Sequence, residues 1–134
     1  MKLFFLHLTC CAFMTGLIWI IQILHYPTFE KIPEKDFLNF HSWHSTKITY
    51  LVGPVMLLEL ATAILLFWLG TNNNLYALNL ILLVLIWLST FFLSVPLHNK
   101  LTKNKNDQHI KNLVRTNWLR TSLWSLRLFI LLLL

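Results

Sequence analysis

The amino-acid sequence predicts an all-α integral membrane protein: a four-helix bundle with a short amphipathic interfacial helix before the second span. Of the 134 residues, 57% are hydrophobic and only 12% are charged. A soluble domain has about a quarter of its residues in charged types, so this chain has too little polar surface to cover a water-facing globule. The apolar residues are also concentrated in long runs, which is typical of membrane spans. We therefore expect a single transmembrane domain over residues 1–134, with spans near residues 3–25, 47–69, 75–97 and 113–134.

The first span is predicted from residues 3–24, an apolar run that contains no charged residue. At a rise of about 1.5 Å per residue, a helix of this length crosses a hydrocarbon core of about 30 Å. Tyr26, Pro27 and Pro33 are expected to break the helix, because proline lacks a backbone N–H and crowds the preceding turn. Asp36 is then expected to cap the next helix.

The second span, residues 48–69, is expected to follow an amphipathic interfacial helix over residues 37–47. Aromatic and histidine side chains recur at helical spacing in that segment. We expect the interfacial helix to continue directly into the span. Within the span, Gly53 and Pro54 should bend the helix and thereby open space in the bundle.

The third and fourth spans are separated from their neighbours by polar segments. Residues 70–74, Gly-Thr-Asn-Asn-Asn, predict a short turn, so the second and third helices should be antiparallel neighbours. The third span should end near Pro96. The fourth span should follow the lysine-rich segment 100–111.

The lysines predict how the chain lies in a membrane. Lys2 is the one lysine on the side of the termini, whereas the first and third loops and their edges contain seven: Lys31, Lys35, Lys47, Lys100, Lys103, Lys105 and Lys111. The positive-inside rule therefore places both of these loops in the cytoplasm, if the membrane is a bacterial inner membrane. The same lysines account for most of the net charge of +6, which is thus better explained by membrane topology than by a nucleic-acid partner.

Five of the six histidines are expected at the cytoplasmic end of the bundle. His41 and His44 are three residues apart and share a helix face, while His25 and His98 arrive from other segments. His109 precedes the fourth span. Imidazoles from three segments, those of His25, His41, His44 and His98, predict a transition-metal or haem site. The alternative is that histidine simply tolerates the headgroup zone, where its ring is half wet.

Glu59 and Arg127 are expected at the same depth, near the bilayer centre. Each lies about 12 residues from the cytoplasmic end of its span, which corresponds to about 18 Å along a helix. A lone carboxylate at that depth is costly, so an ion pair with Arg127 is the first interpretation. The alternative is a catalytic role, in which Glu59 relays protons or coordinates a metal.

Arg120 belongs to a polar stripe on the fourth span, together with Asn117, Trp124 and Arg127, which are spaced three, four and three apart. This stripe should face the interior of the bundle. Arg120 is then in a position to hold a carboxylate, a haem propionate or a polar headgroup. The alternative is that its long side chain reaches the membrane surface.

Several short motifs together resemble a known group of proteins. The motifs are H-Y-P-x-F at 25–29, F-H-x-x-H at 40–44, P-x-x-x-x-E at 54–59, P-L-H-N at 96–99 and N-W-x-R-T-x-x-W-x-x-R at 117–127. They resemble a family of small, largely uncharacterised four-span bacterial membrane proteins, distantly like anthrone oxygenase-type proteins. The resemblance covers nearly the whole chain. It implies a redox step on a lipophilic small molecule, carried out by His25, His41, His44, Glu59, His98, Arg120 and Arg127.

The leading functional hypothesis from the sequence is a membrane redox enzyme. In it, iron, copper or haem held by the four histidines acts on a lipophilic small molecule that enters beside the second span. The alternative is a non-enzymatic membrane carrier, a cofactor- or lipid-binding protein, or a subunit of a complex. The expected partners are the lipid bilayer, the lipophilic molecule and, for so small a carrier, further copies of the chain in a homo-oligomer.

Overall fold

The computed structural model describes residues 1–69 and 73–134, and within these ranges the chain is helical throughout, with short connections and no strand. The predicted all-α class is confirmed. Three helical segments are long and apolar enough to cross a membrane: Lys2–Lys31, Glu34–Leu69 and Asn74–Leu101. The fourth long helix, α6 (Asp107–Leu132), does not meet these criteria.

The first segment consists of α1 (Lys2–Ile20), the π-helical turn η1 (Ile21–His25) and α2 (Tyr26–Lys31). The expected break at Tyr26 and Pro27 is therefore wrong. Pro27 removes one backbone donor and crowds the preceding turn, and the helix accommodates it by widening into a π turn instead of ending. The helix ends at Lys31, and the next residue, Ile32, has the extended backbone that is favoured before a proline, here Pro33.

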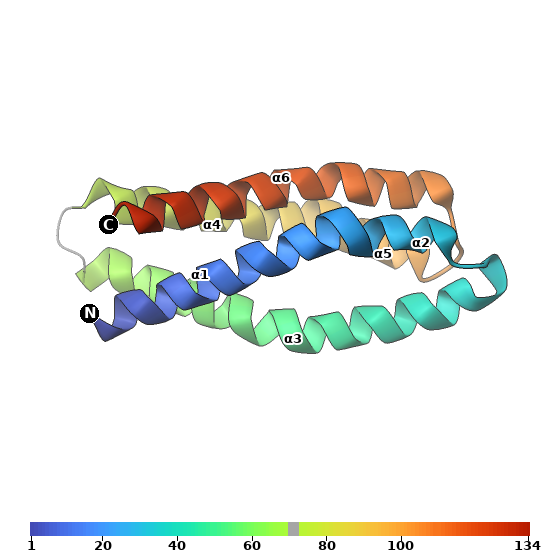
Figure 1. Ribbon diagram of the computed structural model, residues 1–134, viewed down its shortest axis with the longest axis horizontal. Coiled ribbons are helices and arrows are strands. Elements are labelled where there is room, and N and C mark those ends of the chain that lie inside the picture. The colour runs from blue at the N-terminus through green and yellow to red at the C-terminus, as the bar shows by residue number, and fades with distance from the viewer. Residues whose placement is uncertain (70–72) are drawn as a thin grey trace.

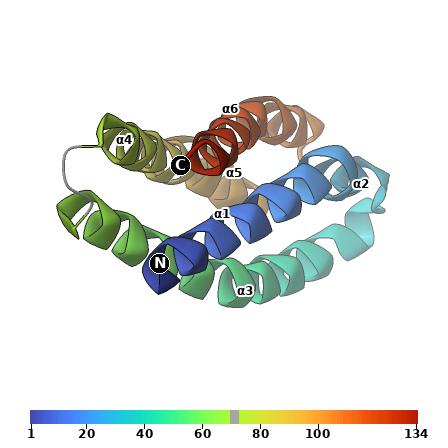
Figure 2. The same cartoon turned by 60° about the vertical axis from the view of Figure 1, so that its left-hand side comes forward.

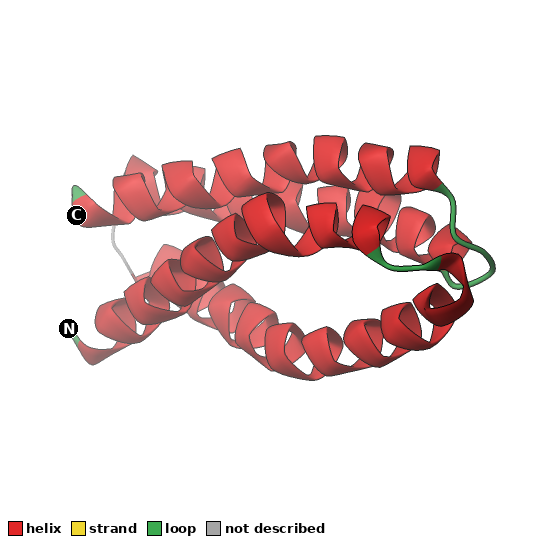
Figure 3. Ribbon diagram, turned by 45° about the vertical axis from the view of Figure 1, so that its right-hand side comes forward, coloured by secondary structure: helices red, strands yellow, loops and turns green. Residues whose placement is uncertain are grey.

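The second segment is one uninterrupted helix, α3 (Glu34–Leu69). A separate interfacial helix is thus not found, and the predicted continuation of residues 37–47 into the span is confirmed. Asp36 is not the cap that the sequence suggested, since it lies in the first turn of α3, where its charge complements the helix dipole. Figure 3 shows α3 bowed away from the rest of the bundle, and Pro54 lies inside this helix.

The third segment repeats the plan of the first. It consists of α4 (Asn74–Ser89), the π turn η2 (Thr90–Ser94) and α5 (Val95–Leu101). Pro96 is the second residue of α5, as Pro27 is of α2, so each π turn ends two residues before a proline. The Asn73 side chain accepts a hydrogen bond from the Leu75 amide at 2.9 Å and caps α4. The turn predicted over residues 70–74 lies largely outside the described residues.

The four long segments form an up-and-down bundle (Figures 1 and 2). α1 packs on α3 and α6, and α4 packs on the same two helices, so neighbours in the sequence are neighbours in space. Both chain ends lie at one end of the bundle (Figure 1). α3 and α4 run antiparallel in contact, as predicted. The lysine-rich loops therefore lie together at the opposite end.

α6 begins at Asp107, several residues before the predicted fourth span at 113. The Asn106 side chain accepts a hydrogen bond from the His109 amide at 3.0 Å and thereby caps the helix. The predicted polar stripe of α6 does face inward, since Asn117, Arg120, Trp124 and Arg127 are all buried. Large apolar side chains cover its outer face instead: Trp118, Leu119, Leu126 and Phe129.

Candidate functional site

The four histidines of the predicted site do converge, but as two separate pairs. His25 Nε2 lies 2.8 Å from His44 Nδ1, and His41 Nε2 lies 3.1 Å from His98 Nδ1. The π turn η1 ends at His25, while the shared face of α3 presents His41 and His44 one turn apart. Phe29 packs against both pairs, with its ring centre within 5.4–5.6 Å of the rings of His25, His41 and His44.

The ligand groups in the described residues bear on the predicted metal or haem site, which stays a prediction. Within residues 1–69 and 73–134, no three His, Cys, Asp or Glu side chains are placed to hold one ion. Each pair offers two nitrogens, whereas catalytic zinc sites typically have three protein ligands. His98 is also occupied at its second nitrogen, since Nε2 lies 3.2 Å from the Tyr26 hydroxyl. His109 does not join either pair among the hydrogen bonds of the described residues.

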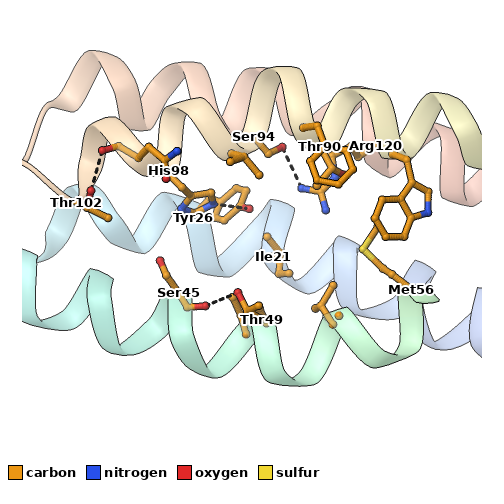
Figure 4. Close-up of a pocket in the computed structure, with 17 residues that line it drawn as sticks. Ile21, Tyr26, Ser45, Thr49, Met56, Thr90, Ser94, His98, Thr102 and Arg120 are labelled. Atoms are coloured by element: carbon orange, nitrogen blue, oxygen red, sulfur yellow. Dashed lines mark hydrogen bonds between the residues drawn. The ribbon is translucent and has the colours of Figure 1, made fainter. Parts of the chain in front are cut away.

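A pocket of about 390 Å³ lies beside the histidine pairs, between α3 and the segment from η2 to α5 (Figure 4). Its walls are mostly apolar and include Val52 and Met56 from α3, Trp87 from α4 and Phe91 from η2. The polar residues that line it come from all four segments: Tyr26, Ser45, Thr49, Thr90, Ser94, His98, Asn99, Thr102 and Arg120. We call the two histidine pairs, together with Tyr26, the histidine cluster. Tyr26 and His98 thus belong both to the histidine cluster and to the pocket.

Gly53, on the bowed helix α3, lies in the wall of this pocket. Gly53 lines the pocket, and a methyl group added at its Cα would meet no atom within 4 Å. The prediction that Gly53 and Pro54 open space in the bundle therefore agrees with the position of the pocket. Any larger side chain at residue 53 would occupy this volume.

Arg120 projects from α6 into the space between α3 and η2 (Figure 4). Only 7% of its surface is exposed, so the side chain lies inside the bundle instead of extending outward from it. Nη1 donates hydrogen bonds to Ser94 Oγ at 3.1 Å and to Asn117 Oδ1 at 3.3 Å. The Trp124 ring lies 5.4 Å from the centre of the guanidinium group. These contacts fix the orientation of the guanidinium group without neutralising its charge.

Three residues that line the pocket carry buried polar atoms without a hydrogen-bond partner in the described part of the chain. These atoms are Ser45 Oγ, Trp87 Nε1 and Arg120 Nε. Buried polar groups in native proteins are almost always hydrogen-bonded, so each exception calls for an explanation. Three of the six buried polar atoms without a partner in the described residues thus belong to residues around this one cavity, and the other three are His41 Nδ1, Ser89 Oγ and His109 Nδ1.

The ion pair predicted between Glu59 and Arg127 is confirmed. Arg127 Nη1 lies 2.6 Å from Glu59 Oε1, and both side chains are fully buried. Arg127 also donates from Nε and Nη2 to Asn79 Oδ1, at 3.2 and 3.0 Å. The indole of Trp124 approaches both carboxylate oxygens of Glu59, at 3.3 and 3.4 Å. A fully paired network of this kind fastens three helices together and does not line the pocket.

His7 is a member of this network that the sequence analysis did not identify. Its Nδ1 lies 2.8 Å from Thr62 Oγ1, and its Nε2 lies 3.4 Å from Asn79 Oδ1 and 3.5 Å from Arg127 Nη2. His7 occurs alone in the first apolar run, far in sequence from the other histidines. Its position inside a span was the available signal, because ionisable residues in membrane helices usually face the bundle interior.

Comparisons with known proteins add no assignment to this geometry. No protein-family model matches the chain, and neither do any curated proteins or solved structures. The resemblance to four-span proteins of the anthrone oxygenase type stays a prediction from the sequence motifs. The class that the structure itself defines is an all-α bundle whose apolar helices are compatible with a membrane protein.

Proposed function

We propose that this chain is a four-span membrane protein that binds a lipophilic small molecule in the pocket between α3 and η2–α5. The three apolar segments supply three spans. α6 is the fourth, because its 26 residues are long enough to cross a core of about 30 Å. Its low hydropathy comes from the polar and charged residues of its first turns and from the polar stripe that faces the bundle, while its exposed side chains after Arg115 are apolar apart from Ser122.

The observation that carries this proposal is the set of unpartnered polar atoms around an apolar cavity. A volume of about 390 Å³ falls within the range of about 300–1,000 Å³ typical of small-molecule sites. Such sites combine apolar walls with a few polar groups that orient the ligand. Here Val52, Met56 and Phe91 provide the walls, and Ser45 and Arg120 provide unpaired polar atoms.

The test is a pocket-filling substitution with a matched control. In lipid nanodiscs, a hexadecanol analogue carrying a diazirine and an alkyne should label residues of the pocket upon irradiation. Gly53→Phe should abolish this labelling, because the new ring occupies the cavity. Gly16→Phe is the control, since Gly16 is exposed and likewise has no atom near its Cα substituent position. Equal labelling of the pocket peptides in the two variants, or none in the wild type, would show that the proposal is wrong.

A second candidate function is the metal- or haem-dependent redox enzyme predicted from the sequence. The observation that favours it is the convergence of four imidazoles beside the same pocket, with nitrogen–nitrogen separations of 2.8 and 3.1 Å. Against it, each pair provides two nitrogens and no third ligand among the described residues. A bound iron or copper ion would therefore need ligands from a bound molecule or from water.

Metal analysis of the purified protein tests this second candidate. If it is correct, iron or copper should be present at a fixed ratio to protein and should be lost in His44→Ala. His109→Ala is the matched control, because His109 belongs to neither pair. Metal that is absent, or that is retained equally by both variants, would contradict the redox assignment and leave the binding function standing.

A further inference from the structure

Arg120 is a buried cation that has no acidic partner in this chain. The sequence contains five acidic residues, and Glu59 is taken by Arg127. The other four lie at the lysine-rich end of the bundle, near or in the connections there: Glu30, Glu34, Asp36 and Asp107. None of them forms an ion pair with Arg120. A buried charge without a counter-charge is costly, so the missing negative charge calls for a source outside the chain.

The geometry of the Arg120 guanidinium group indicates which chemical group supplies this negative charge. Nη1 is occupied by Ser94 and Asn117, whereas Nε is buried without a partner and Nη2 has no hydrogen-bond partner within 3.5 Å among the described residues. The Tyr26 hydroxyl and the His98 ring lie near the same guanidinium group. Nε and Nη2 form one edge of the guanidinium group, and two parallel N–H donors on one edge match the two oxygens of a carboxylate.

Neighbouring contacts hold this free edge in place. The Asn117 amide donates to Gln22 Oε1 at 2.9 Å, which leaves Asn117 Oδ1 to accept from Arg120. Trp124 stacks near the guanidinium group and limits its rotation. The edge is therefore pre-organised by three side chains, which reduces the entropy lost when a ligand binds.

Arg127, on the same helix, is an arginine whose guanidinium group is fully hydrogen-bonded, and it can be compared with Arg120. It lies seven residues, about two turns, beyond Arg120 and therefore on the same face of α6. All three of its nitrogens have partners, namely Glu59 and Asn79. Of these two buried arginines, only Arg120 lines the pocket. The free guanidinium edge is therefore found at the pocket and is not shared by both arginines of α6.

We infer that Arg120 binds the carboxylate of a single-chain lipophilic acid through Nε and Nη2, with the apolar tail lying along Val52, Met56 and Phe91. This inference rests on the proposed binding function and names the class of ligand. The pocket volume suits one small head and part of one chain more readily than a phospholipid with two chains.

The test is a competition series in nanodiscs against the neutral hexadecanol photoprobe. Palmitic acid should compete at least about tenfold more strongly than hexadecanol or methyl palmitate, because only the acid forms two charge-assisted hydrogen bonds with Arg120. Arg120→Lys should reduce this advantage, since lysine keeps the charge but lacks the planar edge. Arg120→Gln should abolish it, so that palmitic acid, hexadecanol and methyl palmitate compete equally, because glutamine has neither the charge nor the two parallel donors.

The outcomes separate this inference from the proposed function. Equal competition by palmitic acid and hexadecanol, with pocket labelling intact, overturns the carboxylate assignment alone. Stronger competition by hexadecyl phosphate than by palmitic acid also overturns it, in favour of a phosphate head. Absence of pocket labelling by the neutral probe overturns the proposed function, and the inference falls with it. The wild-type series decides these cases even if an Arg120 variant fails to fold.

Discussion

At the scale of single residues, the two arginines of α6 have opposite energetic roles. Arg127 is enclosed by Glu59 and Asn79, so its charge is compensated within the chain. Arg120 has hydrogen bonds to neutral groups only. Removing one member of a buried ion pair leaves the other charge unpaired, whereas removing an uncompensated charge relieves a cost.

For the ion pair, we expect Glu59→Ala and Arg127→Met each to lower the free energy of unfolding by about 3–5 kcal/mol. Cys10 and Cys11 are free and buried, so a thiol-reactive fluorophore reports thermal unfolding in mild detergent. Glu34→Gln is the control, because Glu34 is exposed. The reversed pair, Glu59→Arg with Arg127→Glu, should recover part of the loss, and the pairing would be refuted if it recovered none.

For Arg120, we expect a substitution to leave the stability of the ligand-free protein unchanged or to raise it. Arg120→Met should unfold at the same temperature as the wild type or at a higher one, because an apolar side chain replaces a buried unpaired cation. The same thiol assay measures the midpoint after extensive delipidation. A clear drop in the midpoint, comparable to that of Arg127→Met, would indicate that the charge of Arg120 is compensated by the chain itself.

At the scale of secondary-structure elements, three of the four prolines lie inside long helical segments without ending them. Pro27 and Pro96 each follow a π turn, and Pro54 lies within the bowed α3. Both π turns contribute residues to the pocket, Ile21 from η1 and Ser94 from η2. The irregular helical turns thus gather around the cavity, in agreement with the common occurrence of π turns at functional sites.

For α3, we expect Pro54→Ala to stabilise the protein and weaken ligand binding. Proline inside a helix costs about 3 kcal/mol relative to alanine, so the substitution should raise the unfolding midpoint. A straighter α3 lies closer to η2, which should reduce labelling of the pocket by the neutral photoprobe several-fold. Leu57→Ala, at an exposed position of the same helix, is the control. Unchanged labelling in Pro54→Ala would show that the proline does not maintain the pocket.

At the scale of the whole molecule, the bundle separates two polar layers. The Glu59–Arg127 network lies nearer the end that contains both termini, and the histidine pairs lie near the lysine-rich loops. The pocket extends between these layers, from His98 to Met56. A ligand in it would therefore have its chain inside the bundle and contact the histidine cluster at one end.

For membrane topology, we expect Lys103 and Asn74 to lie on opposite sides of the membrane. In intact bacterial cells, an impermeant maleimide should label Asn74→Cys at once and Lys103→Cys only after the cells are opened, because the positive-inside rule places the lysine-rich loops in the cytoplasm. Both positions are exposed, and the two native cysteines are buried, so they provide a low background. Labelling of both variants in intact cells would contradict the four-span topology.

Much of the fold could be predicted from the sequence because its causes are local. Long apolar runs produce long apolar helices, and the spacing of Asn117, Arg120, Trp124 and Arg127 places them on one face wherever the helix packs. The depth of Glu59 and Arg127 follows from counting residues along two helices. The error at Pro27 arose because a proline can be accommodated by widening a helix as well as by ending it.

The sequence by itself determined the all-helical class, the apolar segments, the inward polar face of α6 and the pairing of Glu59 with Arg127. Only the tertiary structure decided that four histidines form two pairs around Phe29, that His7 joins the central network, and that one edge of Arg120 stays free beside a cavity. The physical reason is that spacing along one helix sets which way a side chain points, whereas its partner depends on how neighbouring helices rotate and bend.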